Sequence, residues 1–174
     1  MDRDEPRWLT APELEAWKAF SAMIIKLPAA LDAQLRADAG LNQFEYLVLA
    51  GLSDAPERTL RMSDLAVLAN GSLSRLSHVV KRLEAQGYVR RERCPGDGRA
   101  TNAVLTEDGL RKLVGSAPGH VEQVRSLVVD PLDPEQLDQL RRICLRVLQA
   151  MDPGLSWPPR QVRPEAGDAA EVAP

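Results

Sequence analysis

The chain has 174 residues, enough for one domain with a tail, and 44% of them are hydrophobic, an ordinary share for a globular protein. Only 4% are aromatic, so the core must be built from aliphatic side chains, and plentiful Leu and Ala favour helices over strands. No apolar run approaches the roughly 18 residues of a membrane span, and the acidic N-terminus has no apolar stretch typical of a signal peptide. We therefore expect a cytoplasmic protein without membrane contact.

The charges are distributed unevenly along the chain. The net charge is −3, but residues 58–101 hold nine Lys and Arg against four Asp and Glu, a charge of +5 that leaves −8 for the rest. A basic segment on an otherwise acidic body is typical of a protein that presents one face to a polyanion.

Two helices are predicted in the first third of the chain. From Thr10 to about residue 37, apolar residues recur every three or four positions, and Gly40 is expected to end this helix. Pro28 lies inside it and is expected to kink it. A second helix is predicted over 42–53, with Asn42 as its N-cap.

A short strand and two further helices follow. The strand is expected at 59–61, the third helix at 64–69 with Ser63 as its cap, and the fourth helix at 72–86. Four apolar residues at helical spacing are predicted to form the inner face of the fourth helix: Leu73, Leu76, Val80 and Leu83.

The remaining chain is predicted to form a hairpin, two helices and a tail. Residues 88–105 alternate around a Pro-Gly-Asp-Gly turn, which indicates a β-hairpin with a long basic tip. Helices are expected over 106–129, with Pro118-Gly119 as a candidate bend, and over 133–151. From Pro153 onward, Pro, Ala, Gly and acids dominate, which predicts a disordered tail.

The order helix, turn, helix, hairpin is that of a winged helix-turn-helix protein. With Leu76 pointing inward and about 100° between successive residues, the outer face of the fourth helix carries donors and small residues but no acid, which suits a DNA major groove. An ordinary solvated helix would have a similar face, and it is the adjacent basic hairpin that favours DNA. The residues predicted to contact DNA from this helix are Ser72, Ser74, Arg75, Ser77, His78, Lys81 and Arg82.

The hairpin tip adds Arg93, Asp97 and Arg99 to the predicted DNA site. Arginine on a thin turn can enter the narrow minor groove, where the negative potential is enhanced. Asp97 precedes Arg99 by two residues and could hold its guanidinium in a bidentate pair. A solvated charged loop is the alternative interpretation of these residues.

Other candidate sites are weaker. Cys94 and Cys144 lie far apart without metal-ligand spacing, so neither a disulfide nor a zinc site is expected. No nucleophile–base pair, phosphate loop or dinucleotide motif is visible, so we expect no catalytic residue, metal or cofactor, and no enzyme. Aromatic and apolar residues at helical spacing could form an effector pocket or simply a core: Trp17, Phe20, Ile24 and Tyr46.

Several motifs within residues 10–150 carry a resemblance to a known family. They are Gly40-Leu41, Met62-Ser63-Asp64-Leu65-Ala66, the run from Ser74 to Glu84 followed by Gly87-Tyr88-Val89, and Asp97-Gly98-Arg99-Ala100 leading to Leu105-Thr106 and Gly109. Together they resemble the MarR family (multiple antibiotic resistance regulators). The Asp-x-Arg wing with a downstream Leu-Thr-x-x-Gly is the most specific of these signals.

The resemblance implies a mainly α fold with a small β-hairpin wing. It further implies a homodimer with its body formed by helices 10–38 and 107–151, a DNA-binding part at 41–106, an arm at 1–9 and a tail at 153–174. The implied function is that of a repressor that binds an inverted-repeat operator in double-stranded DNA. Release by a small aromatic or phenolic effector, or by thiol oxidation, is also implied. The alternative function is a winged-helix protein–protein interaction module without DNA binding.

Overall fold

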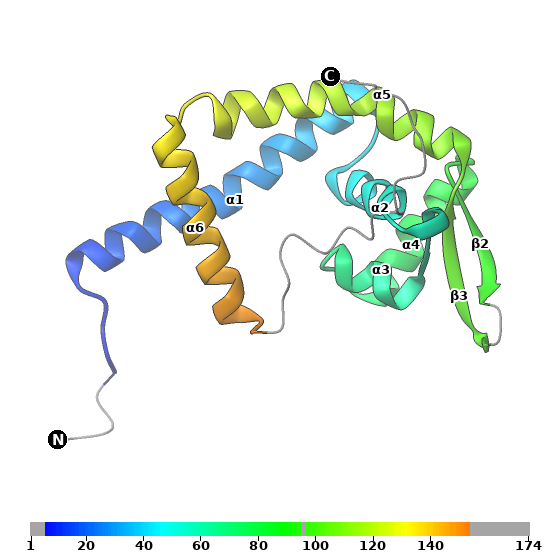
Figure 1. The fold of residues 1–174 in the computed structure, drawn as a ribbon, viewed down its shortest axis with the longest axis horizontal. Helices are drawn as coiled ribbons and strands as arrows, with labels where there is room; N and C mark the ends of the chain where they lie inside the picture. The colour runs from blue at the N-terminus through cyan, green and yellow to red at the C-terminus, as the bar shows by residue number, and fades with distance from the viewer. Residues whose placement is uncertain (1–5, 95–96, 154–174) are drawn as a thin grey trace, which may run out of the picture.

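The structure, a computed structural model, describes residues 6–94 and 97–153 (Figure 1). Most of the predicted arm and tail therefore lies outside the described residues, as do residues 95 and 96 of the hairpin. The elements in chain order are α1 (Ala11–Ala39), α2 (Gln43–Ser53), the 3₁₀ turn η1 (Pro56–Arg58), β1 (Thr59–Arg61), α3 (Met62–Leu68), α4 (Leu73–Ala85), β2 (Val89–Cys94), β3 (Asp97–Leu105), α5 (Glu107–Val124), the π-helical segment η2 (Arg125–Val129) and α6 (Pro134–Met151).

Helix α1 begins and ends where local chemistry predicts. The Thr10 backbone N–H donates to the Glu13 carboxylate at 2.8 Å, which satisfies a donor that the first turn leaves without a helical partner. The helix continues through Pro28 to Ala39, and Gly40 closes it with a left-handed φ of 62°.

Helix α3 begins earlier than predicted. Its first residue is Met62 rather than Asp64, and Arg61, the last residue of β1, is the N-cap. Ser63 is not the cap because its hydroxyl donates to the Asp64 carboxylate at 3.0 Å instead of accepting from a backbone N–H. Strand β1 thus leads directly into α3 without a loop.

The three strands form an antiparallel sheet in the order β1-β3-β2. The predicted hairpin is present, and Leu60 of β1 lies opposite Ala103 of β3. Strand β3 is longer than expected, since it starts at Asp97 and pairs with the charged strand β2. Polar side chains on the exposed face obscure the alternation of apolar and polar residues in the sequence. The register shifts at Arg93 and Cys94, so the hairpin carries a β-bulge near its tip.

The region after the wing contains one departure from α-helical geometry, and it does not lie at the predicted place. Helix α5 runs through Pro118, and the π-helical segment η2 follows at its C-terminal end. There the Asp130 N–H donates to the Arg125 carbonyl at 2.8 Å, five residues back, and the two side chains form an ion pair. Asp133 then caps α6, as predicted.

The hydrophobic core lies within the winged-helix part. It is formed by α2, α3, α4, the sheet and the first turns of α5, so these elements behave as one packed unit. Its fully buried side chains are aliphatic, as the scarcity of aromatic residues predicts: Val48, Leu49, Leu52, Leu65, Leu76, Val80, Leu83 and Val89.

Gly109 lies in the first turn of α5, where this helix passes close to the turn after α4. A Cβ at this position would lie 2.1 Å from the Tyr88 carbonyl oxygen, so only glycine allows this approach. Thr106, the N-cap of α5, donates its hydroxyl to the Gly87 carbonyl at 2.6 Å and accepts from the Gly109 N–H at 3.0 Å. The Leu-Thr-x-x-Gly motif therefore locks α5 onto the turn after α4.

The helices outside the core are arranged differently. Helix α5 packs along α1, and α6 turns down from the end of α5 that is remote from the wing, as Figure 1 shows. No residue of α6 is buried in the single chain. Its apolar residues Ile143, Val147 and Met151 are exposed. An amphipathic helix in this state needs a further surface to cover its apolar side.

Glu45 is the one buried acid that the structure records among the described residues, with only 2% of its surface exposed. One carboxylate oxygen accepts the Asn42 N–H at 2.8 Å, which completes the capping box of α2. The other forms an ion pair with Arg82 of α4. This carboxylate therefore joins the start of α2 to the last turn of the fourth helix.

We expect Glu45→Ala to lower the free energy of unfolding by about 2 kcal/mol, because it removes the cap and leaves the Asn42 N–H and the half-exposed Arg82 without their acceptor. Glu45→Gln keeps an acceptor for the N–H and should cost about half as much. Urea denaturation measures both. Arg111→Ala, which removes an exposed ion pair with Asp108 on α5, serves as the control and should change the stability by less than about 0.5 kcal/mol.

Candidate nucleic-acid interface

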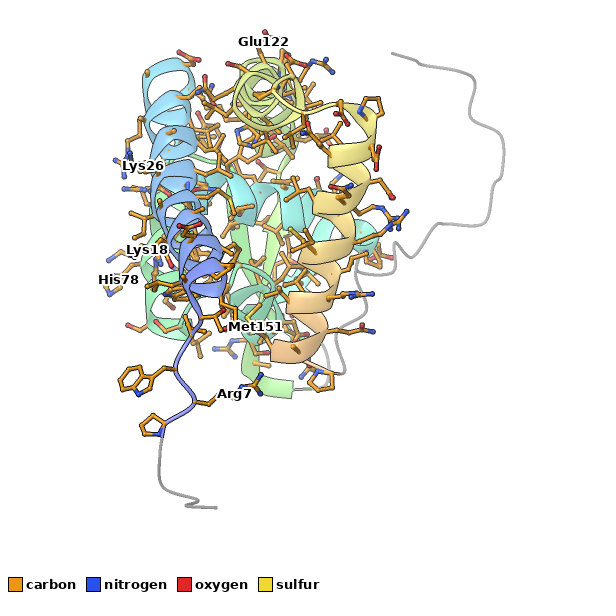
Figure 2. The ribbon with its side chains drawn as sticks, turned by 90° about the vertical axis from the view of Figure 1, so that its left-hand side faces the viewer. Arg7, Lys18, Lys26, His78, Glu122 and Met151 are labelled. Carbon is orange, nitrogen blue, oxygen red and sulfur yellow. The ribbon has the colours of Figure 1, made fainter. Side chains whose placement is uncertain are left out.

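Helix α4 presents a polar face to solvent. Ser72 caps it by accepting the Arg75 N–H at 3.2 Å. Ser74, His78 and Lys81 are exposed, whereas Leu76 is fully buried on the opposite side, as predicted. His78 lies at the surface of the molecule in Figure 2, so its ring is available to a ligand that approaches α4.

Arg75 is held over an aromatic ring that the sequence analysis did not connect with it. Its guanidinium carbon lies 4.3 Å from the centre of the Phe44 ring, a cation–π contact between α4 and α2. The Arg75 side chain is nevertheless exposed, so it can use its donors while the ring restrains it. The sequence did not predict Phe44 as a site residue, because a position in the sequence does not show which helix will pack beside it.

Arg82 has a different environment from Arg75. The sequence predicts it as a DNA contact, but its guanidinium pairs with the buried Glu45 carboxylate. The pair fixes α4 against α2 through the Nε donor, and the side chain stays half-exposed. Ser77 and Lys81 carry no such buried partner among the described residues.

The wing is tied to α4 by a second ion pair. Arg91 of β2 donates to the Glu84 carboxylate through Nε at 2.9 Å and through Nη2 at 2.6 Å, and its backbone N–H contacts the other oxygen at 3.2 Å. The Arg91 guanidinium beside Glu84 holds the pKa of that carboxyl below its ordinary value of 4.5. The wing therefore keeps a defined orientation relative to α4.

The basic tip of the wing is only partly described. Arg93 is exposed at the end of β2, consistent with a surface that can meet DNA. Asp97 and Arg99 belong to the backbone of β3, but their side chains lie outside the described residues, and so does the predicted pair between them. Cys94, beside the bulge, is half-buried.

A cleft of about 330 Å³ lies between the start of α3, the first turns of α4 and the wing. Its polar lining comes from Ser63 of α3, Ser77 of α4 and Arg91 of β2. Leu73 also faces this cleft and is 55% exposed, so its predicted place on the inner face of α4 is wrong. The buried face of α4 begins one turn further along, at Leu76.

The four residues of the predicted effector pocket lie on two helices, α1 and α2. Trp17 and Phe20 contact each other on α1, with ring centres 6.2 Å apart, and Ile24 is exposed. Tyr46 packs instead on His120 of α5 at 4.4 Å, and burial lowers the pKa of that imidazole. Sequence spacing could not show this separation, because Tyr46 lies on another helix.

A larger cleft of about 590 Å³ lies elsewhere, between α1, α2 and α4. Arg36 of α1 and the Phe44–Arg75 pair lie in its wall. Asp32, also in this wall, accepts from Arg36 at 2.6 Å and from the Gln43 N–H at 2.9 Å, and these bonds lower its pKa. The cleft therefore combines charged side chains with one aromatic ring.

Two further classes of site can be examined in the described residues. Within residues 6–94 and 97–153, no group of three or more His, Cys, Asp or Glu side chains is placed to hold a metal ion. No helix in the same part of the chain has the length and apolarity needed to cross a membrane.

A helix-turn-helix with an exposed donor-rich fourth helix and an adjacent antiparallel wing defines the class of winged-helix nucleic-acid-binding proteins. Comparison with known proteins identifies the group within that class. A sequence profile of the MarR family matches residues 39–100. The curated HTH-type transcriptional regulator MhqR of Bacillus subtilis is 30% identical over 109 residues, which cover 62% of this chain and 72% of MhqR.

Two solved structures from Streptomyces coelicolor extend the similarity over the fold. Sco3205, a MarR family transcriptional regulator in complex with DNA, is 45% identical, with a TM-score of 0.82 over 87% of this chain and 95% of that one. AbsC, also a MarR family regulator, is 38% identical, with a TM-score of 0.78 over 84% and 98%. The chain belongs to the MarR family and is a DNA-binding transcriptional regulator.

The Glu84–Arg91 pair should make the stability of the wing depend on pH. Because the pKa of Glu84 is lowered in the folded chain, the pair stabilises the wing fully above about pH 4.5, and this stabilisation is lost as the pH falls through the folded pKa. We expect the Glu84 carboxyl to titrate below 4.5 by NMR and to move back toward that value in Arg91→Ala. Arg111→Ala should leave the midpoint where it is, and an unchanged midpoint in Arg91→Ala would contradict the pairing.

Proposed function

We propose that the chain acts as a homodimeric repressor that places α4 in the major groove and the wing in the adjacent minor groove of an inverted-repeat operator. The observation that carries this proposal is the exposed, acid-free face of α4, supported near its C-terminal end by two ion pairs and near its N-terminal end by the Arg75–Phe44 contact. The 45% identity to Sco3205, which was solved with DNA, supports the same arrangement. A small effector then regulates binding.

Within this interface the side chains have different roles. Ser74, Arg75 and His78 read base edges from the first two turns of α4, since a recognition helix contacts bases mainly through its N-terminal residues. Ser72, Ser77, Lys81 and Arg93 contact the phosphate backbone, and Arg99 of the wing enters the minor groove. Asp97 orients Arg99, and Arg82 acts through Glu45 as a positioning residue.

The dimer body is formed by residues 10–38 and 107–151, with residues 41–106 as the DNA-binding part. Helix α6 buries no residue in the single chain, and α1 also exposes large apolar side chains, Trp17 and Ile25 among them. A second copy would cover these faces, and twofold symmetry would match half-sites about 34–36 Å apart.

The effector site is proposed for the cleft between α1, α2 and α4. Its volume, about 590 Å³, fits a small aromatic compound. A carboxylate or phenolate would meet Arg36 at one end, and the ring would reach Phe44, which carries Arg75. Occupation of the cleft would then move a base-reading side chain without contact between effector and DNA.

A second function, a winged-helix protein–protein module, is favoured by the acidic charge outside residues 58–101. A gel shift with the chain's own promoter region at a stated salt concentration separates the two functions. Retarded DNA that resists unrelated competitor DNA supports the regulator, and DNA that is not retarded at all supports the module.

Arg75→Ala and His78→Ala should weaken binding to the operator more than binding to random DNA. Each lost base contact costs about 1–3 kcal/mol of discrimination when the contact is bidentate. Fluorescence anisotropy with both DNAs at one salt concentration gives the ratio of the affinities. Arg93→Ala is the matched control, because a lost phosphate contact weakens both DNAs alike. An unchanged ratio for both α4 variants rules out their base-reading role.

Light scattering should give twice the chain mass at micromolar concentration. Ile143→Asp places a charge on the exposed apolar side of α6 and should shift the protein toward monomer. Gln149→Asp introduces the same charge on another side of the same helix and should leave the dimer intact. A wild-type monomer, or equal effects of the two variants, would contradict the proposed dimer body.

Benzoate, an aromatic carboxylate, should weaken operator binding by the wild type, whereas acetate at the same concentration should not, because it lacks the ring that reaches Phe44. Arg36→Ala should bind the operator normally and lose the response to benzoate. Equal responses to the two acids, or an unaltered response in Arg36→Ala, would exclude this cleft as the effector site.

A further inference from the structure

Leu73 is the exposed large apolar side chain in a helix face that is otherwise polar. It occupies the first position of α4, and 55% of its surface is exposed. Its sequence neighbours are polar: Ser72 caps the helix, and Ser74 and Arg75 are exposed. A single exposed leucine is common on protein surfaces, so its exposure alone indicates nothing. Its place on the recognition helix is what carries the inference.

The surroundings of Leu73 limit what can cover it. It lies in the cleft between the start of α3, α4 and the wing, beside Ser77 and Arg91. The cleft also holds Met62 and Ala100, so its lining combines cationic and hydroxyl groups with apolar side chains. An occupant that combines negative charge with a small apolar group matches this lining. The surface of DNA has this combination, because phosphates border the major groove and the thymine C5-methyl group projects into it.

We infer that Leu73 is a specificity-determining residue that contacts the C5-methyl group of a thymine in each operator half-site. The inference rests on the proposed function, because it needs α4 in the major groove. The leucine contributes no hydrogen bond, so it distinguishes thymine from the other bases by the methyl group alone. Ser74 and Arg75, on the neighbouring positions, read donors and acceptors of adjacent bases.

The test removes that methyl group from the DNA and changes nothing else. The preferred duplex is first selected from randomised DNA with the wild-type dimer. Each dT is then replaced by deoxyuridine, in both half-sites at once, and the Kd is measured for the wild type, Leu73→Ala and Val67→Ala at one salt concentration. Val67 is the matched control, since it is an aliphatic residue of α3 with 81% exposure that lies off the recognition helix.

At one dT position the wild type and Val67→Ala should lose affinity by about fourfold per half-site, the equivalent of one buried methyl group. Leu73→Ala should bind the dT and deoxyuridine duplexes equally well. The wild-type measurement needs no variant, so a folding defect cannot imitate the result, and thermal unfolding of Leu73→Ala is expected to match the wild type.

Three results overturn the inference. The selected half-site could require no thymine, every dT could be replaced without loss in the wild type, or Leu73→Ala could show the same deoxyuridine loss as the wild type. In each of these cases sequence-selective binding persists and the proposed function stands. A wild-type protein that selects no sequence at all contradicts the proposed function as well as the inference.

Discussion

The buried carboxylate of Glu45 is the constraint on which the rest of the DNA-binding part depends. A charged group with 2% exposure is tolerated only when its oxygens are matched by donors. Here the donors are the Asn42 N–H at the start of α2 and the Arg82 guanidinium of α4. Without the carboxylate the Asn42 N–H would lose its acceptor, and without its donors the carboxylate would be left unsatisfied in the core. The angle and depth of α4 against α2 follow from that requirement.

The first turn of α2 therefore controls both flanks of the recognition helix. Phe44 supports Arg75 on one turn of α4, and Glu45 holds Arg82 two turns further on. Asp32 of α1 in turn accepts the Gln43 N–H at 2.9 Å, which attaches this same turn to the long N-terminal helix. A movement at the α1–α2 junction is thus transmitted, through a few covalent and hydrogen bonds, to the residues that we propose read DNA. A ligand in the cleft between these helices could change DNA binding by this route.

The chain divides its two kinds of surface between two regions. Its excess of positive charge lies in residues 58–101, which contain α4 and the wing, and Glu84 uses one of these arginines to fix the wing. Large exposed apolar side chains lie on α1 and α6, among them Trp17, Ile25 and Ile143. In Figure 2, Lys26 of α1 and Met151 of α6 mark the two helices on either side of the view. A basic reading surface and an apolar association surface are the two requirements of a dimeric regulator, and one fold keeps them apart.

The sequence by itself determined the elements, the caps of α1, α2, α4 and α6, and the polar outer face of α4, because helical periodicity, capping boxes and turn residues are local properties. It also identified the motifs of the family and the basic wing. Only the tertiary structure showed which partner each arginine of α4 has. Arg75 and Arg82 look alike in the sequence, but Arg75 contacts the Phe44 ring and Arg82 pairs with the buried Glu45 carboxylate. The tertiary structure separated Tyr46 from Trp17 and moved Leu73 from the core to the surface, because the end of a core depends on where neighbouring elements stop. Contacts between distant segments have no local signature, and for that reason Phe44 and Glu45 became part of the site only when α2 and α4 were packed together.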